Sequence, residues 1–97
     1  MILSPLMALA EPTRLAAVSI LWDGSEHCVC ELMKRLDATQ SRMSRHMLTL
    51  KQAGLVVDRR DAQWVRYGLN PDMRPEVRNV LAAVMAAGVA AETKNAA

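Results

Sequence analysis

The chain has 97 residues and a net charge of +2, and 52% of its residues are hydrophobic while 23% are charged. This length supports one compact domain, and the mixture of apolar and charged residues is typical of a globular protein rather than a disordered one. The longest stretch without Asp, Glu, Lys or Arg, Asn79–Ala91, is shorter than the roughly 20 residues of a membrane-spanning helix. Met1–Ala10 lacks the basic residues of a signal peptide, so we expect a cytoplasmic protein with no membrane partner.

Positive charge is concentrated in the middle of the chain. Residues 34–66 hold eight Lys and Arg residues against three Asp residues, whereas residues 1–33 carry a net charge of −3 and residues 67–97 are neutral overall. A basic segment is an electrostatic footprint for nucleic acid, although a charged stretch is more often a solvated surface. The order of the predicted elements must therefore decide between these interpretations.

Apolar residues at helical spacing predict two helices at the start of the chain and one at its end. The first lies within residues 3–10, and the second begins at Pro12, which suits a first helical turn, and ends before Asp23-Gly24. The last opens at Pro75 and carries an apolar stripe that reaches Val89. Because the terminal helices are more apolar than one small domain can cover, we expect them to join two copies of the chain across a two-fold axis.

Two short helices in the middle of the chain have the outline of a helix-turn-helix. The first follows a polar loop at residues 25–27, has an apolar stripe from Val29 to Leu36 and ends at Asp37. The second follows a short turn, has Thr39 as a favourable N-cap and stops at Ala53-Gly54. It has an apolar side to pack and a polar, cationic side to present.

A β-hairpin is predicted directly after these helices. Residues 55–60 and 63–69 are rich in β-branched and aromatic residues, and only Asp61-Ala62 separates them. We expect Trp64 to pack within the hairpin and Ala62 to adopt a positive φ, which two-residue turns often need. Basic residues beside the hairpin tip are suited to lie along DNA phosphates.

This order of elements predicts a winged helix-turn-helix, a mainly α fold with a small β-hairpin. We expect one DNA-binding domain over residues 1–90, a frayed tail over residues 91–97 and a homodimer. Arg45 is the best candidate to read guanine, while His46 is interpreted as a packing or phosphate partner. The predicted DNA-contacting residues are Gln40, Ser41, Arg42, Ser44, Arg45, Lys51, Arg59, Arg60 and Arg66.

Five short motifs follow one another from the first predicted helix to the hairpin. They are Leu9-Ala10-Glu11-Pro12-Thr13-Arg14-Leu15, Cys28-Val29-Cys30-Glu31-Leu32, Gln40-Ser41 with Met43-Ser44-Arg45-His46-Met47, Ala53-Gly54-Leu55-Val56, and Trp64-Val65-Arg66-Tyr67. Together they resemble the ArsR/SmtB family of repressors, and the resemblance covers nearly the whole chain. The resemblance implies a homodimer that represses a palindromic operator in double-stranded DNA until a metal, a metalloid or another inducer binds.

Within that family, Cys28-Val29-Cys30 resembles the inducer site of members that respond to arsenic and antimony. Those members often carry a third cysteine where this chain has Met33. A pyramidal trivalent metalloid needs fewer ligands than zinc, so the two cysteines with Met33, His27 or an outside thiol are expected to suffice for As(III) or Sb(III). DNA binding itself is expected to need no cofactor.

The spacing of the two cysteines also predicts a mechanism. Side chains two residues apart on a regular helix point about 200° apart, so chelation must distort the first turn of the third helix. The helix N-terminus favours thiolates, and one intervening residue is too few for an unstrained disulfide, so reduced thiols are expected. Two alternatives stay open: an inert pair of core cysteines, or a repressor that senses oxidants or persulfides through an inserted sulfur, a mixed disulfide or a partner subunit. An enzyme is not expected, because neighbours such as His27-Cys28 rarely reach catalytic geometry.

Overall fold

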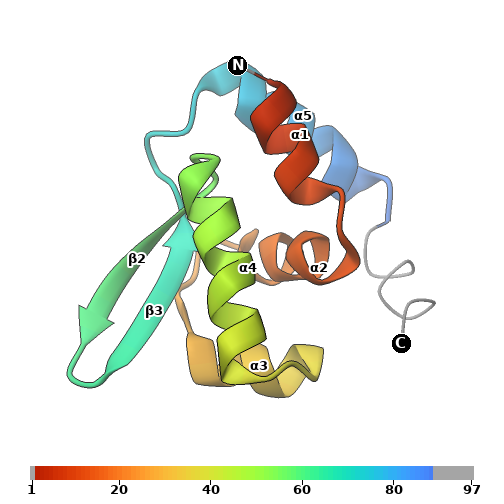
Figure 1. The fold of residues 1–97 in the computed structure, drawn as a ribbon. Helices are drawn as coiled ribbons and strands as arrows, with labels where there is room; N and C mark the ends of the chain where they lie inside the picture. Colours follow the sequence, from red (N-terminus) through yellow and green to blue (C-terminus); the bar gives the residue numbers. More distant parts are fainter. Residues whose placement is uncertain (1, 89–97) are drawn as a thin grey trace.

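Five helices and a three-stranded sheet form residues 2–88, the part of the chain that the computed structural model describes (Figure 1). The helices are α1 (Leu3–Leu9), α2 (Pro12–Leu21), α3 (Val29–Leu36), α4 (Gln40–Gln52) and α5 (Pro75–Ala86). The strands are β1 (His27–Cys28), β2 (Val56–Asp61) and β3 (Trp64–Leu69). All five predicted helices are confirmed, and none of them is long and apolar enough to cross a membrane. The predicted tail at residues 91–97 lies outside the described residues.

Local sequence explains where the helices begin and end. Pro12 and Pro75 occupy the first turns of α2 and α5, where a backbone N–H has no partner inside the helix. Thr39 caps α4, because its side-chain oxygen accepts a hydrogen bond of 3.3 Å from the Arg42 N–H. Gly54 follows α4 with a φ of 81°, which a glycine adopts without strain. The predicted helix-turn-helix of α3 and α4 is therefore present.

The hydrophobic core lies between the helices and the base of the sheet. Figure 1 shows the β2–β3 hairpin projecting to one side of the helical part, with α4 running beside it. The side chains that are completely buried come from α2, α3, α4, α5 and the segment that enters β2; they include Leu21, Leu32, Met43, Met47, Leu50, Leu55 and Leu81. Since α4 buries three of these residues on one side, its opposite side remains available to a ligand.

The sheet has one strand more than the sequence predicts. The segment expected to be a polar loop includes His27, which pairs with Tyr67, and the next residue, Cys28, pairs with Arg66. These pairs make β1 antiparallel to β3, and the strand order is β1-β3-β2. Two residues are too few to show an alternating pattern, which explains why the strand escapes prediction. The cysteine segment is therefore an edge of the same sheet that forms the wing.

The turn of the hairpin lies one residue later than predicted. Asp61 pairs with Trp64, so the connection is Ala62-Gln63 and not Asp61-Ala62. Ala62 has a φ of 57°, which confirms the predicted positive φ. Trp64 is 46% exposed, so the expectation that it packs within the hairpin is wrong. Its place in the last pair of the hairpin puts it beyond the buried base of the sheet.

Candidate nucleic-acid interface and thiol site

The solvent side of α4 presents most of the predicted base-reading residues. Gln40, Ser41, Arg42 and Arg45 are exposed, whereas Ser44 is half-buried. Among residues 2–88, neither Arg42 nor Arg45 has an ion-pair partner, so both guanidinium groups are available to DNA.

Sequence reasoning overlooked one residue of this surface. Leu48, one turn after Arg45, is 50% exposed and is an apolar side chain on the otherwise polar face of α4. An apolar side chain in this position is suited to the methyl group of thymine. The signal was in the sequence, because Leu48 does not share the helical spacing of Met43, Met47 and Leu50.

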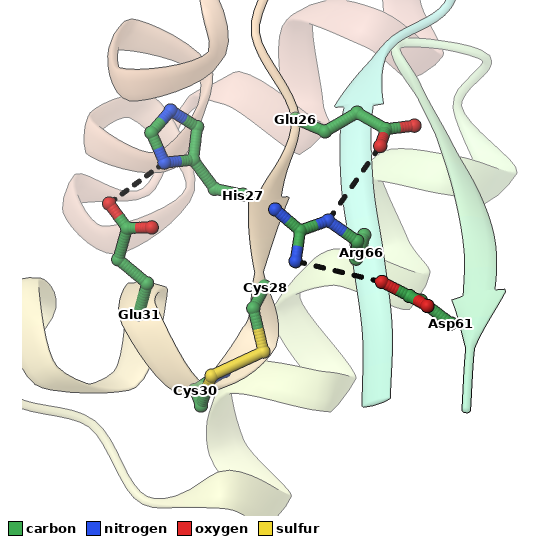
Figure 2. Close-up of a disulfide and its surroundings, with 7 residues drawn as sticks. All are labelled: Glu26, His27, Cys28, Cys30, Glu31, Asp61 and Arg66. Carbon is green, nitrogen blue, oxygen red and sulfur yellow. Dashed lines mark hydrogen bonds and ion pairs between the residues drawn. A yellow bond between two sulfur atoms is a disulfide. The ribbon is translucent and has the colours of Figure 1, made fainter. Parts of the chain in front are cut away.

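Glu26 connects the start of β1 to the wing through two arginines, of which Figure 2 shows Arg66. Arg59 donates from Nε and Nη2 to the Glu26 carboxylate at N···O distances of 2.7–3.3 Å. The Arg66 Nε atom lies 3.7 Å from Glu26 Oε1, and its Nη1 atom lies 4.0 Å from Asp61 Oδ2. The hydrogen bond from Arg59 holds the pKa of Glu26 below its ordinary value, so this carboxylate is charged at neutral pH.

The other two predicted phosphate contacts, Lys51 and Arg60, differ from each other in whether their charge is paired. Lys51 Nζ lies 3.0 Å from Asp58 Oδ1, so its charge is also paired. Arg60 has no ion-pair partner in the part of the chain that the structure describes. Within the described residues, the positive charge of the basic segment is therefore partly neutralised at Lys51, Arg59 and Arg66, whereas Arg42, Arg45 and Arg60 have no ion-pair partner.

Cys28 and Cys30 are joined by a disulfide, with their Cα atoms 5.2 Å apart (Figure 2). The expectation of reduced thiols is therefore wrong. Cys28 is the N-cap of α3 and has an extended backbone, with φ −65° and ψ 146°, so only Cys30 belongs to the helix. The two side chains converge for that reason, and the predicted distortion of the first helical turn is not needed to bring both sulfur atoms to one ligand.

The two sulfur atoms have different surroundings. Cys28 is only 7% exposed, and its Sγ atom accepts a hydrogen bond of 3.2 Å from the Cys30 N–H. Cys30 is exposed on the first turn of α3. A small reagent in solution therefore reaches Cys30 first and Cys28 second.

The predicted third ligands are both engaged elsewhere in this structure. The His27 Nδ1 atom lies 2.9 Å from Glu31 Oε2, and its Nε2 atom lies 2.9 Å from Ser25 Oγ. Figure 2 shows the His27 ring turned toward Glu31 and away from the sulfur atoms. Met33 is half-buried and packs against the core. Within residues 2–88, no three His, Cys, Asp or Glu side chains gather to hold a metal ion, so the site offers two sulfur ligands.

Comparison with known proteins finds similar sequences and the same fold in regulators of transcription. Residues 11–57 match the family described as "Bacterial regulatory protein, arsR family". The chain is 40% identical over 74 residues to the arsenic resistance transcriptional regulator ArsR2 of Pseudomonas putida, covering 76% of this chain and 64% of that protein. It is 44% identical over 63 residues to the arsenical resistance operon repressor of Escherichia coli, covering 65% of this chain and 54% of that protein.

A solved structure extends this similarity to the whole described fold. HlyU from Vibrio cholerae superimposes with a TM-score of 0.77 and 34% identity over 89% of each chain. The chain spans 54–64% of the length of the two curated relatives described above.

Proposed function

The chain belongs to the ArsR family of bacterial regulatory proteins, and on this premise we propose that it is a DNA-binding repressor released from its operator by As(III) or Sb(III). The observation that carries the proposal is the convergence of two cysteine sulfur atoms at the N-terminus of α3, the first helix of the DNA-binding motif. DNA binding needs no cofactor in this proposal, and the protein acts in the cytoplasm, where its operator lies.

The exposed side of α4 is the proposed reader of base edges in the major groove. Arg45, which has no ion-pair partner in the described residues, makes a bidentate contact to guanine, with Gln40, Ser41 and Ser44 beside it. Arg42 contacts a base or a phosphate. Lys51, Arg59, Arg60 and Arg66 contact phosphates, which give affinity but carry no sequence information.

The exposed apolar surface of α1 supports a homodimer. Leu3, Leu6 and Met7 are 41–64% exposed, which is costly for a monomer in water. A palindromic operator also requires two copies related by a two-fold axis. Sedimentation at micromolar concentration tests this arrangement. A stable monomer that binds a palindromic operator with full affinity contradicts it.

The chemistry of release requires the reduced form of the thiol site. Arsenite, As(OH)₃, forms one As–S bond with each thiol; each bond replaces a hydroxide, which leaves as water with the thiol proton. Two such bonds join Cys28 and Cys30 through one arsenic atom, while the third position keeps its hydroxide or takes an outside thiol. Soft trivalent metalloids favour sulfur over the oxygen and nitrogen ligands nearby.

The decisive experiment is release of a fluorescent operator, followed by anisotropy after reduction with a phosphine. Dithiothreitol is avoided because it is itself a dithiol ligand for arsenic. Arsenite and phenylarsine oxide, which forms only two bonds to sulfur, should both release the reduced wild-type protein. The variant Cys28→Ser/Cys30→Ser should bind the operator within about twofold of wild type and resist both compounds, because repression and sensing use different residues. Release of this variant at wild-type concentrations would show that the cysteine pair is not the sensor.

The role of a third ligand has its own variant. Met33→Cys restores the third thiolate found in related arsenic-responsive motifs. It should lower the arsenite concentration needed for release and leave the response to phenylarsine oxide unchanged, because the latter cannot use a third sulfur. An equal gain for both compounds would mean that position 33 acts by another route than coordination.

The disulfide favours a second candidate function, a repressor that responds to oxidants. In that reaction hydrogen peroxide takes two electrons from the two thiols, the S–S bond forms, and two molecules of water leave with both thiol protons. A direct disulfide makes an inserted sulfur or a partner subunit unnecessary. Release of the reduced protein by peroxide, without release by arsenite or antimonite, would select this function over the first.

A further inference from the structure

We propose that Arg14 and His46 form a positioning contact that sets the orientation of α4, and with it the fit of Arg45 to the operator. This inference rests on the proposed base-reading role of α4. It concerns the motif Glu11-Pro12-Thr13-Arg14 and the histidine of α4, neither of which has a role in DNA contact or sensing so far.

One arginine side chain reaches two other helices. Arg14 Nε donates a hydrogen bond of 2.5 Å to the carbonyl oxygen of Ala8 in α1, and Arg14 Nη1 donates one of 3.2 Å to His46 Nδ1 in α4. Its own backbone N–H donates to Glu11 Oε1 at 2.8 Å, which caps α2. Because a guanidinium group only donates, His46 Nδ1 must be the acceptor in this contact.

The contact is partly buried and lies between α4 and α2, away from the proposed reading side of α4. The His46 side chain is 17% exposed and that of Glu11 29%, and Glu11 Oε1 lies 4.0 Å from His46 Nδ1. His46 directly follows the proposed guanine reader Arg45. Its ring is therefore turned toward α2, which favours the packing interpretation of His46 over a phosphate contact.

The Arg14–His46 hydrogen bond restrains the rotation of α4 about its axis more strongly than the apolar packing of α4 does. The buried residues Met43, Met47 and Leu50 hold α4 in place, but apolar contacts have no preferred direction, and methionine adapts easily to its surroundings. The hydrogen bond from Arg14 weakens steeply when its angle changes. It therefore resists rotation of α4 about its axis, and such a rotation would move Arg45 out of bidentate reach of a guanine.

The same contact extends to α1. Ala8 lies on α1, the helix proposed to join the two copies, so Arg14 connects the dimer contact to the base-reading helix through one side chain. Half-site spacing in a palindrome depends on the distance between the two reading helices. The contact is thus placed to set that distance as well as the rotation of each helix.

The test compares two substitutions of His46 in the full chain. His46→Asn places an amide oxygen close to the position of Nδ1 and keeps the acceptor, whereas His46→Leu removes it. The readout is the ratio of affinities for the operator and for a scrambled duplex at fixed salt, with the thermal midpoint measured alongside. We expect His46→Leu to lower this ratio roughly fivefold, with affinity for scrambled DNA unchanged, and His46→Asn to stay within about twofold of wild type. Equal ratios in both variants, whether lowered or unchanged, overturn the proposal.

A second variant keeps the test valid if His46→Leu lowers the thermal midpoint. Arg14→Lys retains the charge but not the planar fork that spans Ala8 and His46. It should reduce the ratio of affinities to a similar degree as His46→Leu. The double variant Arg14→Lys/His46→Leu should have a ratio no lower than that of the more affected single variant, because both substitutions break the same contact. Additive losses overturn the proposal. Arg45→Ala is the control. If Arg45→Ala lowers the ratio while His46→Leu keeps the wild-type ratio, only the positioning contact is refuted. If Arg45→Ala also keeps the wild-type ratio, the reading role of α4 is refuted as well.

Discussion

Helix α4 and the β2–β3 wing both carry arginines that are suited to DNA, but they hold them differently. On α4, Arg42 and Arg45 project from a capped helix with a buried opposite side and make no ion pair within the described residues. On the wing, Arg59 and Arg66 are tied to Glu26 from a different part of the chain. The difference teaches that the charge counted along residues 34–66 overestimates the positive potential of the wing, because the fold places the carboxylate of Glu26, which lies outside that segment, beside two of its arginines.

The largest expected effect concerns Arg45 on the exposed side of α4. Arg45→Ala should cost about 1–3 kcal/mol of operator binding and should relax discrimination at one base pair, because a bidentate guanine contact is worth that much. Affinities for a set of operators with single base changes measure both effects. A uniform loss over all sequences would place Arg45 among the phosphate contacts instead.

A smaller effect is expected from the unpaired arginine of the wing. Arg60→Ala should weaken binding to all sequences alike and should reduce the slope of log affinity against log salt by about one, the value for one lost phosphate contact. Arg59→Ala should reduce the slope less, because Glu26 already neutralises much of its charge. Titrations at several salt concentrations measure both slopes. Equal slopes would show that the ion pair does not reduce the contribution of Arg59.

The turn of the wing gives a test of stability rather than charge. Ala62 has a φ of 57°, a conformation that strains a residue with a Cβ atom. Ala62→Gly should therefore raise stability by about 1 kcal/mol, which corresponds to roughly 4–8 °C in the thermal midpoint of a domain of this size. Calorimetry checks the midpoint, with Gln63→Gly as the matched control at the neighbouring turn position. A fall in the midpoint of Ala62→Gly would indicate a different turn.

The smallest expected effect comes from the carboxylate that restrains the wing. Glu26→Gln removes the charge that neutralises Arg59 and Arg66, and it should tighten operator binding roughly two- to fivefold and steepen the salt dependence. Glu31→Gln is the control, because Glu31 pairs with His27 and Arg35 and, within residues 2–88, has no ion pair with the wing. Weaker binding by Glu26→Gln would mean that the carboxylate aligns the two arginines instead of withholding them.

Local signals in the sequence predicted most of the fold. The five helices, the Thr39 cap and the positive φ of Ala62 follow from spacing, capping and turn rules that act over a few residues. The sequence does not predict strand β1, because two residues are too few to show the alternation of apolar and polar side chains that marks a strand. Its pairing with β3 also depends on contacts between residues some forty positions apart along the chain. The Glu26–Arg59 pair is hidden for the same reason, because its two residues lie 33 positions apart.

The thiol site was predicted in its residues but not in its geometry. The spacing of Cys28 and Cys30 predicts a sulfur site, but a regular helix through both residues would make their side chains diverge. The extended backbone of Cys28 comes from its pairing with Arg66, so the convergence of the sulfur atoms is a product of the sheet. Spacing within one motif does not contain this information.

The cap of α3 places the helix and the inducer in competition for one atom. Cys28 Sγ accepts a hydrogen bond from the Cys30 N–H, and the same atom would bind arsenic, which would weaken it as an acceptor. Side-chain caps are worth about 0.5–2 kcal/mol, and sulfur, a weak acceptor, belongs at the low end of that range. Serine is a stronger cap, so we expect Cys28→Ser to stabilise the start of α3 in a variant that, under the proposed function, does not respond to arsenite. In the proposed function, position 28 exchanges some helix stability for sensitivity, and any stability that α3 loses when arsenic binds is subtracted from the affinity for arsenic.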